Sequence, residues 1–180
     1  MIFYFYFSIA VLIILFFTSI IIYFGRAYIT GAPYAVSTQS KTKLIISILQ
    51  DEIKTRKDKQ KIKAVDLGSG DGRIVIALAR AGFEAHGYET NPYLVCLSRL
   101  RIWIAGLSGK AFIHQRNYWQ EDLEKYDVLV CFGVFYMMEK LERKLSEELR
   151  PGSLVVSNYF KLPQWKEKLE KNKIFLYVRS

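Results

Sequence analysis

The stretch from Asp66 to Arg73, with the sequence DLGSGDGR, holds the residue types most suited to chemistry in this 180-residue chain. Glycines let a backbone turn tightly and approach a ligand closely, and the first turn of a helix presents N–H groups that the helix itself does not use. An apolar run at 63–67 precedes the stretch and a helical pattern at 73–81 follows it. We therefore expect a loop that binds a nucleotide-like cofactor.

The glycine spacing indicates which cofactor. The dinucleotide fingerprint G-x-G-x-x-G would need a small residue at Arg73, whereas the third glycine here is Gly72, one position earlier. Asp66 precedes the loop, and its carboxylate could bind the cationic amino group of a methionine moiety, directly or through water. A diphosphate would gain nothing from that carboxylate, so the pattern favours S-adenosylmethionine over NAD.

Glu89 ends the next strand-like run, about twenty residues after the glycines, where an acidic side chain can accept hydrogen bonds from both ribose hydroxyls. Alone, either the glycine loop or this carboxylate is a weak signal. A plain turn and a surface carboxylate are the alternative, and strands on both sides argue against it.

Around these residues, short apolar runs alternate with helical stretches from residue 62 onward. Strands are expected at 63–67, 83–88, 111–115, 127–132, 153–160 and 173–179, and helices at 73–81, 92–105 and 138–149. The alternation predicts an α/β fold: a mostly parallel sheet over residues 62–180 with helices on both faces and the ligand at the carboxyl ends of the strands.

The first part of the chain has a different character. Residues 2–24 carry no charge, and at about 1.5 Å per helical residue they could cross a hydrocarbon core of about 30 Å. A signal peptide would need a basic start and a shorter apolar stretch. We expect a transmembrane anchor at 1–28, then a connector and an amphipathic helix at 29–61.

The net charge and the cysteines constrain which partners, membrane orientation and metal or disulfide sites the protein can have. The formal net charge is +9, which fits an anionic lipid surface or a nucleic acid equally well. Positive residues appear only after the apolar segment, from Arg26 onward, so the positive-inside rule places the C-terminal domain on the cytoplasmic side, or on the matrix side of a mitochondrion. Cys96 and Cys131 show no spacing typical of a metal site or a disulfide framework.

The chain from Pro33 to Trp165 resembles the seven-β-strand protein lysine methyltransferases that act on the ATP synthase c subunit and the adenine nucleotide translocase, and their prokaryotic relatives. The resemblance depends on the glycine loop and on the stretches GYETNPYLV from Gly87, SRLR from Ser98, Trp119, Phe132-Gly-Val, LRPG from Leu149 and LPQW from Leu162. The same resemblance implies a class I, Rossmann-like methyltransferase sheet.

The resemblance also implies methyl transfer to a lysine ε-amine. The anchor makes sense if that lysine belongs to a membrane protein, so we expect a membrane protein substrate and the lipid bilayer as partners, and no nucleic acid. The resemblance assigns S-adenosyl-L-methionine to Asp66, to the loop residues Gly68, Ser69, Gly70 and Gly72, to Glu89, and to Asn117. Asn117 stands where relatives carry an aspartate, and an asparagine can still hydrogen-bond an adenine amine.

Aromatic residues follow the two strand ends nearest the expected methyl group, where they could line a lysine channel and hold its cationic forms. They are Phe132, Phe135, Tyr136, Tyr159, Phe160 and Trp165, most of which also suit a hydrophobic core. We predict that Tyr136 and Trp165 position the acceptor.

Other functions remain open at this point. The anchor suits methylation of a lipid-like or quinone-like small molecule equally well, and a membrane-tethered module that only binds the cofactor is also possible. RNA methylation is weaker, because the chain has no separate recognition domain.

Overall fold

A computed structural model describes residues 4, 6–15, 17–19, 38–54 and 62–180. The chain divides into two compact units, Met1–Ala35 and Val36–Ser180. In the first unit the described residues 4, 6–15 and 17–19 are helical. The predicted membrane-spanning segment and the connector lie partly outside the described residues. Among those that are described, no helix is both long and apolar enough to cross a membrane.

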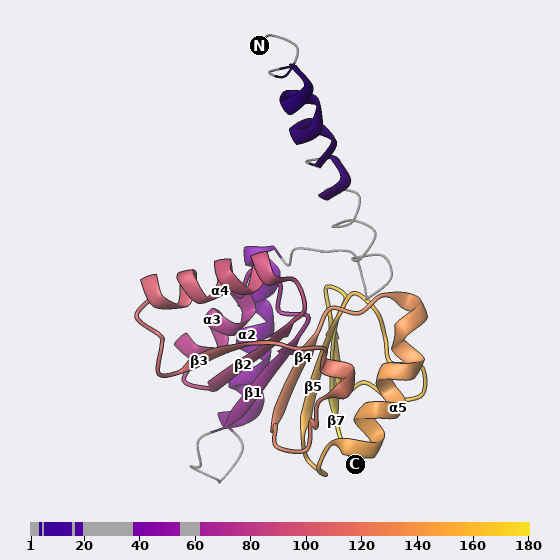
Figure 1. Cartoon of the computed structure of the whole chain (residues 1–180). Coiled ribbons are helices and arrows are strands. Elements are labelled where there is room, and N and C mark those ends of the chain that lie inside the picture. Colours follow the sequence, from indigo (N-terminus) through magenta and orange to yellow (C-terminus); the bar gives the residue numbers. More distant parts are fainter. Residues whose placement is uncertain (1–3, 5, 16, 20–37, 55–61) are drawn as a thin grey trace. The chain divides into compact units, whose positions relative to one another are not determined.

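The second unit is built on a seven-stranded sheet with the strand order β3-β2-β1-β4-β5-β7-β6 (Figure 1). Its strands are β1 Lys63–Leu67, β2 Glu84–Glu89, β3 Ala111–Gln115, β4 Val128–Cys131, β5 Leu154–Asn158, β6 Leu169–Lys171 and β7 Ile174–Val178. The first five strands run parallel, and β7 runs antiparallel to both of its neighbours, β5 and β6. The predicted α/β fold is confirmed.

Helices cover both faces of the sheet (Figure 1). Helices α2 Gln39–Lys54, α3 Arg73–Arg80 and α4 Pro92–Ile104 contribute Leu49, Leu78 and Val95 to one hydrophobic core. Helix α5 Met138–Glu148 contributes Leu141 and Leu145 to a second core on the opposite face. Strand β4, which lies between the two cores, is buried at all four positions, as expected for a parallel strand covered on both sides.

Local sequence explains where several elements begin. The side chain of Asn91 accepts a hydrogen bond from the N–H of Tyr93, and Pro92 occupies the first position of α4, so this helix starts as its sequence predicts. Strand β6 was not predicted. It pairs with β7 through a two-residue turn in which Asn172 and Lys173 have φ values of 51° and 59°, the conformation of a type I′ hairpin.

Candidate functional site

The glycine loop follows β1, which lies between β2 and β4 in the sheet. Strands β1 to β3 extend in one direction from this point and strands β4 and β5 in the other, so the loop stands at the topological switch point of the parallel sheet. In open α/β sheets the crevice at the carboxyl ends beside that point is where ligands bind. The short helix η1, Tyr118–Gln120, and the short helix η2, Phe135–Met137, follow β3 and β4 at the same edge.

The loop needs its glycines. Gly68, Gly70 and Gly72 have φ values of 76°, 54° and 77°, a left-handed conformation that other residues rarely adopt. The N–H groups of Gly68 and Ser69 both donate to the carbonyl of Tyr88, which fixes the loop against the end of β2. A Cβ on Gly72 would lie 2.9 Å from the Cβ of Ser98, because α4 packs directly on the loop.

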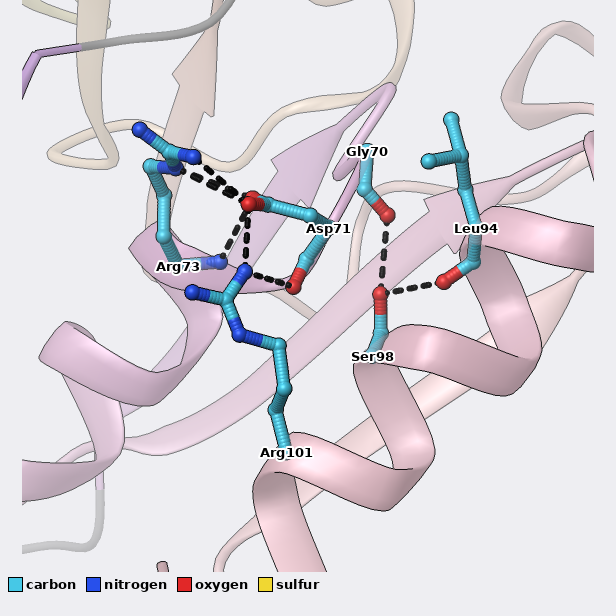
Figure 2. Close-up of polar contacts among 6 residues, drawn as sticks. All are labelled: Gly70, Asp71, Arg73, Leu94, Ser98 and Arg101. Atoms are coloured by element: carbon cyan, nitrogen blue, oxygen red, sulfur yellow. Dashed lines mark hydrogen bonds and ion pairs between the residues drawn. The ribbon is translucent and has the colours of Figure 1, made fainter.

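Asp71 is the centre of a charged network that links the loop to two helices. Its carboxylate accepts hydrogen bonds from Nε and Nη2 of Arg73 and from Nη1 of Arg101, and the Arg101 guanidinium also donates to the Asp71 carbonyl (Figure 2). Burial alone would raise the pKa of Asp71, but the two guanidinium groups lower it to about 2. Ser98, on the same face of α4 as Arg101, lies with its hydroxyl 2.8 Å from the Gly70 carbonyl and 2.7 Å from that of Leu94. These bonds hold the loop in one shape before any ligand arrives.

Glu89 closes the loop from the β2 side. One carboxylate oxygen accepts from the N–H of Gly70 at 3.0 Å, and the other accepts from Thr90 and Asn91, each at 2.8 Å. An ionised carboxylate has about four lone-pair positions. Three protein donors therefore orient the group and leave capacity for a ribose hydroxyl.

Asp66 lies in β1 and is 3% exposed. Within the described residues no group donates a hydrogen bond to its side chain. Burial, and then the negative charges of Glu89 and Asp71, raise the pKa of Asp66 to about 8. Burial and the two neighbouring carboxylates disfavour the ionised form of the Asp66 carboxyl. A cationic ligand group would stabilise that form, so the position favours such a group.

The remaining predicted cofactor residues differ in what they can offer. The Ser69 hydroxyl is buried and has no hydrogen-bond partner among the residues that the structure describes. A Cβ built on Gly87 would lie 2.6 Å from it, so Ser69 faces the sheet and can reach a ligand only through its backbone. Asn117 caps η1 by accepting from the N–H of Trp119. The neighbouring residue Arg116 donates its N–H to the carbonyl of Glu89, which places Asn117 near the end of β2.

The two predicted acceptor residues are not brought together. Tyr136 lies on η2, directly after the carboxyl end of β4, and is 69% exposed. The Trp165 indole donates to the Ser146 hydroxyl and lies 5.7 Å from the guanidinium of Arg179. Since the Arg179 N–H donates to Ser153, just before β5, this places Trp165 toward the opposite edge of the sheet.

Asp71, Ser98 and Arg101 are not among the site residues expected from the sequence. A signal existed, since Ser98 and Arg101 are three residues apart on one predicted helix and so share a face. The partners of that face could not be known before the helix was placed against the loop.

Several known proteins are similar to this chain. Residues 66–169 match the family described as the ANTKMT methyltransferase domain. The rat lysine N-methyltransferase of the ATP synthase c subunit is 41% identical over 133 residues, which cover 74% of this chain and 58% of that protein. The mouse adenine nucleotide translocase lysine N-methyltransferase is 38% identical, covering 74% and 55%. The chain thus spans about half the length of such curated relatives.

Two further matches cover most of both chains. A protein-lysine N-methyltransferase of the archaeon Saccharolobus islandicus is 30% identical over 147 residues, which are 79% of this chain and 85% of that protein. Among solved structures, an RNA methyltransferase of Salinibacter ruber in complex with S-adenosyl-L-homocysteine has a TM-score of 0.68 at 27% identity, covering 81% of this chain and 92% of that one.

Proposed function

Because the chain belongs to the ANTKMT methyltransferase domain family, we propose that it is an S-adenosylmethionine-dependent protein-lysine N-methyltransferase that acts on a membrane protein. The supporting relatives are lysine N-methyltransferases from animals and an archaeon, and two of them are named for membrane proteins, the ATP synthase c subunit and the adenine nucleotide translocase.

The observation that carries this proposal is the polar arrangement at the switch point. Glu89 is held beside the glycine loop by three N–H groups, and Asp66 is a buried carboxyl without a donor in the described part of the chain. The residues present therefore fit S-adenosylmethionine, which carries a ribose diol and a cationic amino group. Asp66, Gly68, Gly70, Gly72 and Glu89 would hold it, with Ser69 through its backbone and Asn117 near the adenine.

When bound, the cofactor supplies a methyl group on a positively charged sulfur. The protein's part is to orient and desolvate the acceptor. A lysine amine has an unperturbed pKa of about 10.4 and must lose its proton to attack, so a partly apolar surface that disfavours the ammonium form assists the reaction. The exposed rings of Phe135 and Tyr136, beside the end of β4, supply such a surface. In-line positioning supplies much of the rest.

The main experiment is to follow a radiolabelled methyl group from the cofactor into membranes that contain candidate acceptors. Label on a protein band that yields methyl-lysine after acid hydrolysis supports the proposal. Label in lipid or quinone would instead favour the small-molecule function. Label in RNA would favour an activity like that of the Salinibacter ruber RNA methyltransferase. Binding of S-adenosylmethionine in calorimetry without any label transfer would indicate a non-catalytic module.

The finer proposal is that the enzyme works at a membrane. Residues 2–24 carry no charge, and we propose that they anchor the chain as a single span with the catalytic domain on the cytoplasmic or matrix side. Resistance of the full chain to a carbonate wash, and digestion of the domain by protease added to that side, are the expected results. Release by carbonate would contradict the anchor, and protection from protease would contradict the orientation.

Helix α4 offers the catalytic domain a second contact with the bilayer. Five large apolar side chains on it are 43–75% exposed, namely Tyr93, Leu97, Leu100, Trp103 and Ile104, and four of them follow at the helical spacing i, i+4, i+7 and i+11. Residues 92–110 contain no acidic residue, and Arg99 and Lys110 are basic residues of this stretch that do not bind Asp71. An apolar stripe with aromatic residues and basic neighbours is typical of a helix that lies in the interface of an anionic membrane.

This contact can be tested in vesicles that contain anionic lipid and brominated acyl chains, with the full chain reconstituted into them. Bromine quenches tryptophan only at short range, so the Trp103 emission should be quenched and the Trp103→Phe variant should lose the quenched component. Trp165→Phe is the matched control and should keep it. Unquenched Trp103 would contradict the contact, and a cross-linked dimer through α4 would assign the stripe to a second copy.

A further inference from the structure

Lys41 lies near the start of α2 and has an unusual environment for a lysine. Its Nζ donates a hydrogen bond to Oδ1 of Asn158 at 3.1 Å and lies 3.8 Å from the centre of the Tyr159 ring. The Nζ of Lys173 lies 4.9 Å from the centre of the same ring. One amine is therefore held by an amide oxygen and an aromatic face together, as a binding site for an alkylammonium ion would hold it.

The position of this amine matters as much as its contacts. Asn158 is the last residue of β5 and is fully buried, and Cys131 at the end of β4 pairs with the preceding residue, Ser157. Phe132 follows β4, and its ring centre lies 5.9 Å from that of Tyr159. The Lys41 amine therefore lies at the carboxyl edge of the sheet, on the β4–β5 side of the switch point, and the glycine loop follows β1 at this same edge.

The backbone is adapted to present the Tyr159 ring. Tyr159 has a φ of 84°, a left-handed conformation that a residue with a large side chain rarely adopts. Its N–H donates to the carbonyl of Lys173 at 2.7 Å, so the β6–β7 hairpin holds it in place. Strain of this kind persists where the surrounding structure enforces it, and it often marks a functional site.

The surroundings also favour the reactive form of the amine. Burial, and then the positive charge of Lys173, lower the pKa of Lys41, which raises the fraction of neutral amine at a given pH. Lys43, two residues further along α2, is exposed and shares none of these contacts in the described part of the chain. Lys43 is therefore a control within the same helix.

We propose that Lys41 is an internal acceptor, held in the amine subsite formed by Asn158 and Tyr159 and methylated by its own active site. This inference rests on the proposed lysine methyltransferase function. In the transfer, the lone pair of the neutral Lys41 Nζ forms the bond to the methyl carbon, the carbon–sulfur bond breaks, and its electron pair remains on sulfur. A proton of the Lys41 ammonium passes to water before the attack, and the products are S-adenosylhomocysteine and the methylated ammonium.

The test has two readouts on the full chain. First, trace labelling with acetic anhydride at several pH values, without cofactor, reports the pKa of each amine. We expect the pKa of Lys41 to lie below the ordinary lysine value, and Lys173→Gln, which removes the neighbouring positive charge, to raise it. Second, incubation with S-adenosylmethionine and peptide mass spectrometry should reveal one or more added methyl groups on the Lys41 peptide. Lys41→Arg should abolish the signal, and Lys43→Arg should leave it unchanged.

The outcomes separate this inference from the function on which it depends. Methylation of an external protein without any at Lys41 would overturn the internal acceptor and leave the enzyme function intact. Absence of cofactor binding would overturn both. A rate constant that rises with protein concentration would show transfer between molecules and contradict an internal acceptor. Methylation at Lys173 alone, or a Lys41 pKa at the ordinary lysine value, would contradict it as well.

Discussion

The two sides of the switch point are built from different kinds of residue. On the loop side, which comprises Gly68–Gly72 and Glu89, buried polar groups bond to one another and to the helices behind them. On the aromatic side, which comprises Phe132, Phe135, Tyr136 and Tyr159, large rings follow β4 and β5, and those of Phe135 and Tyr136 are 81% and 69% exposed. The loop side is thus already in one shape, whereas the aromatic side presents surface that a partner could cover.

The difference indicates when each side becomes ordered and buried. A preorganised loop loses its conformational entropy when the protein folds, so a small cofactor can bind without rearranging it. The exposed rings of the aromatic side would become buried only when a macromolecular acceptor docks. Mutations on the loop side should therefore affect stability and cofactor affinity, and mutations on the aromatic side should affect turnover.

The largest expected effect is at Gly72. Gly68→Ala and Gly72→Ala both force a left-handed residue, at φ values of 76° and 77°, which costs roughly 1–2 kcal/mol in each. A Cβ at Gly68 meets no described atom within 4 Å, whereas a Cβ at Gly72 meets Ser98 at 2.9 Å. Overpacking there adds about 1–3 kcal/mol.

Urea unfolding of the two variants measures this difference directly. Gly72→Ala should lose more free energy of unfolding than Gly68→Ala and should lose cofactor binding with it. Equal losses of unfolding free energy in the two variants would show that α4 moves to accommodate the added methyl group, and that Ser98 does not hold the loop rigidly.

The next effect is at Glu89. Glu89→Ala removes a charged acceptor whose hydrogen bonds are worth about 1.5–3 kcal/mol each, so cofactor affinity should fall by roughly ten- to a hundred-fold. Isothermal titration with S-adenosylhomocysteine measures the change. Glu139→Ala, at an exposed position in the first turn of α5, is the control. An unchanged affinity in Glu89→Ala would remove Glu89 from the cofactor site.

A third pair of variants tests the aromatic side. Tyr136→Ala should lower turnover on an external acceptor by about ten-fold and leave cofactor affinity unchanged, as loss of an aromatic contact to a lysine would. Trp165→Phe keeps the packing against Tyr177 but loses the bond to Ser146. It should lower the free energy of unfolding by about 1 kcal/mol without changing turnover. If Trp165→Phe reduced turnover as Tyr136→Ala does, both residues would belong to the acceptor site, as the sequence predicts.

The contrast between the sides also explains what the sequence could predict. The loop side is nearly contiguous, so glycine spacing, Asp66 and Glu89 could be recognised before the fold was known. The parallel sheet followed from the alternation of short, mostly apolar runs with helical stretches. The aromatic side joins Lys41 to Asn158, 117 positions apart, through a strained Tyr159, and no local pattern predicts such a contact. Strand β6 was missed because its three residues, Leu169–Lys171, are all exposed and show no apolar pattern.

The smallest expected effect is a proton released when the cofactor binds, and it depends on Asp66. In the free protein the Asp66 pKa is about 8, so at pH ~6.5 the carboxyl is mostly protonated. The α-amino group of the cofactor has a pKa of about 8 if it resembles a free amino terminus, and is mostly charged at that pH. A bound ammonium favours the ionised carboxyl, so most of one proton should leave on binding. Affinity should rise about six-fold between pH ~6.5 and ~7.5, because the ionised fraction of Asp66 rises about eight-fold while the charged fraction of the amino group falls slightly.

The folding equilibrium shifts in the opposite direction, since a raised native pKa means that the folded chain holds this proton more tightly than the unfolded chain. Asp66 should therefore reduce stability progressively as the pH rises from about 4 toward 8. Titration calorimetry in two buffers of different ionisation enthalpy counts the released proton. Asp66→Asn should release none and bind with a flatter pH dependence. Proton release that persists in Asp66→Asn would assign the proton to another carboxyl and exclude Asp66 as the partner of the cofactor's amino group.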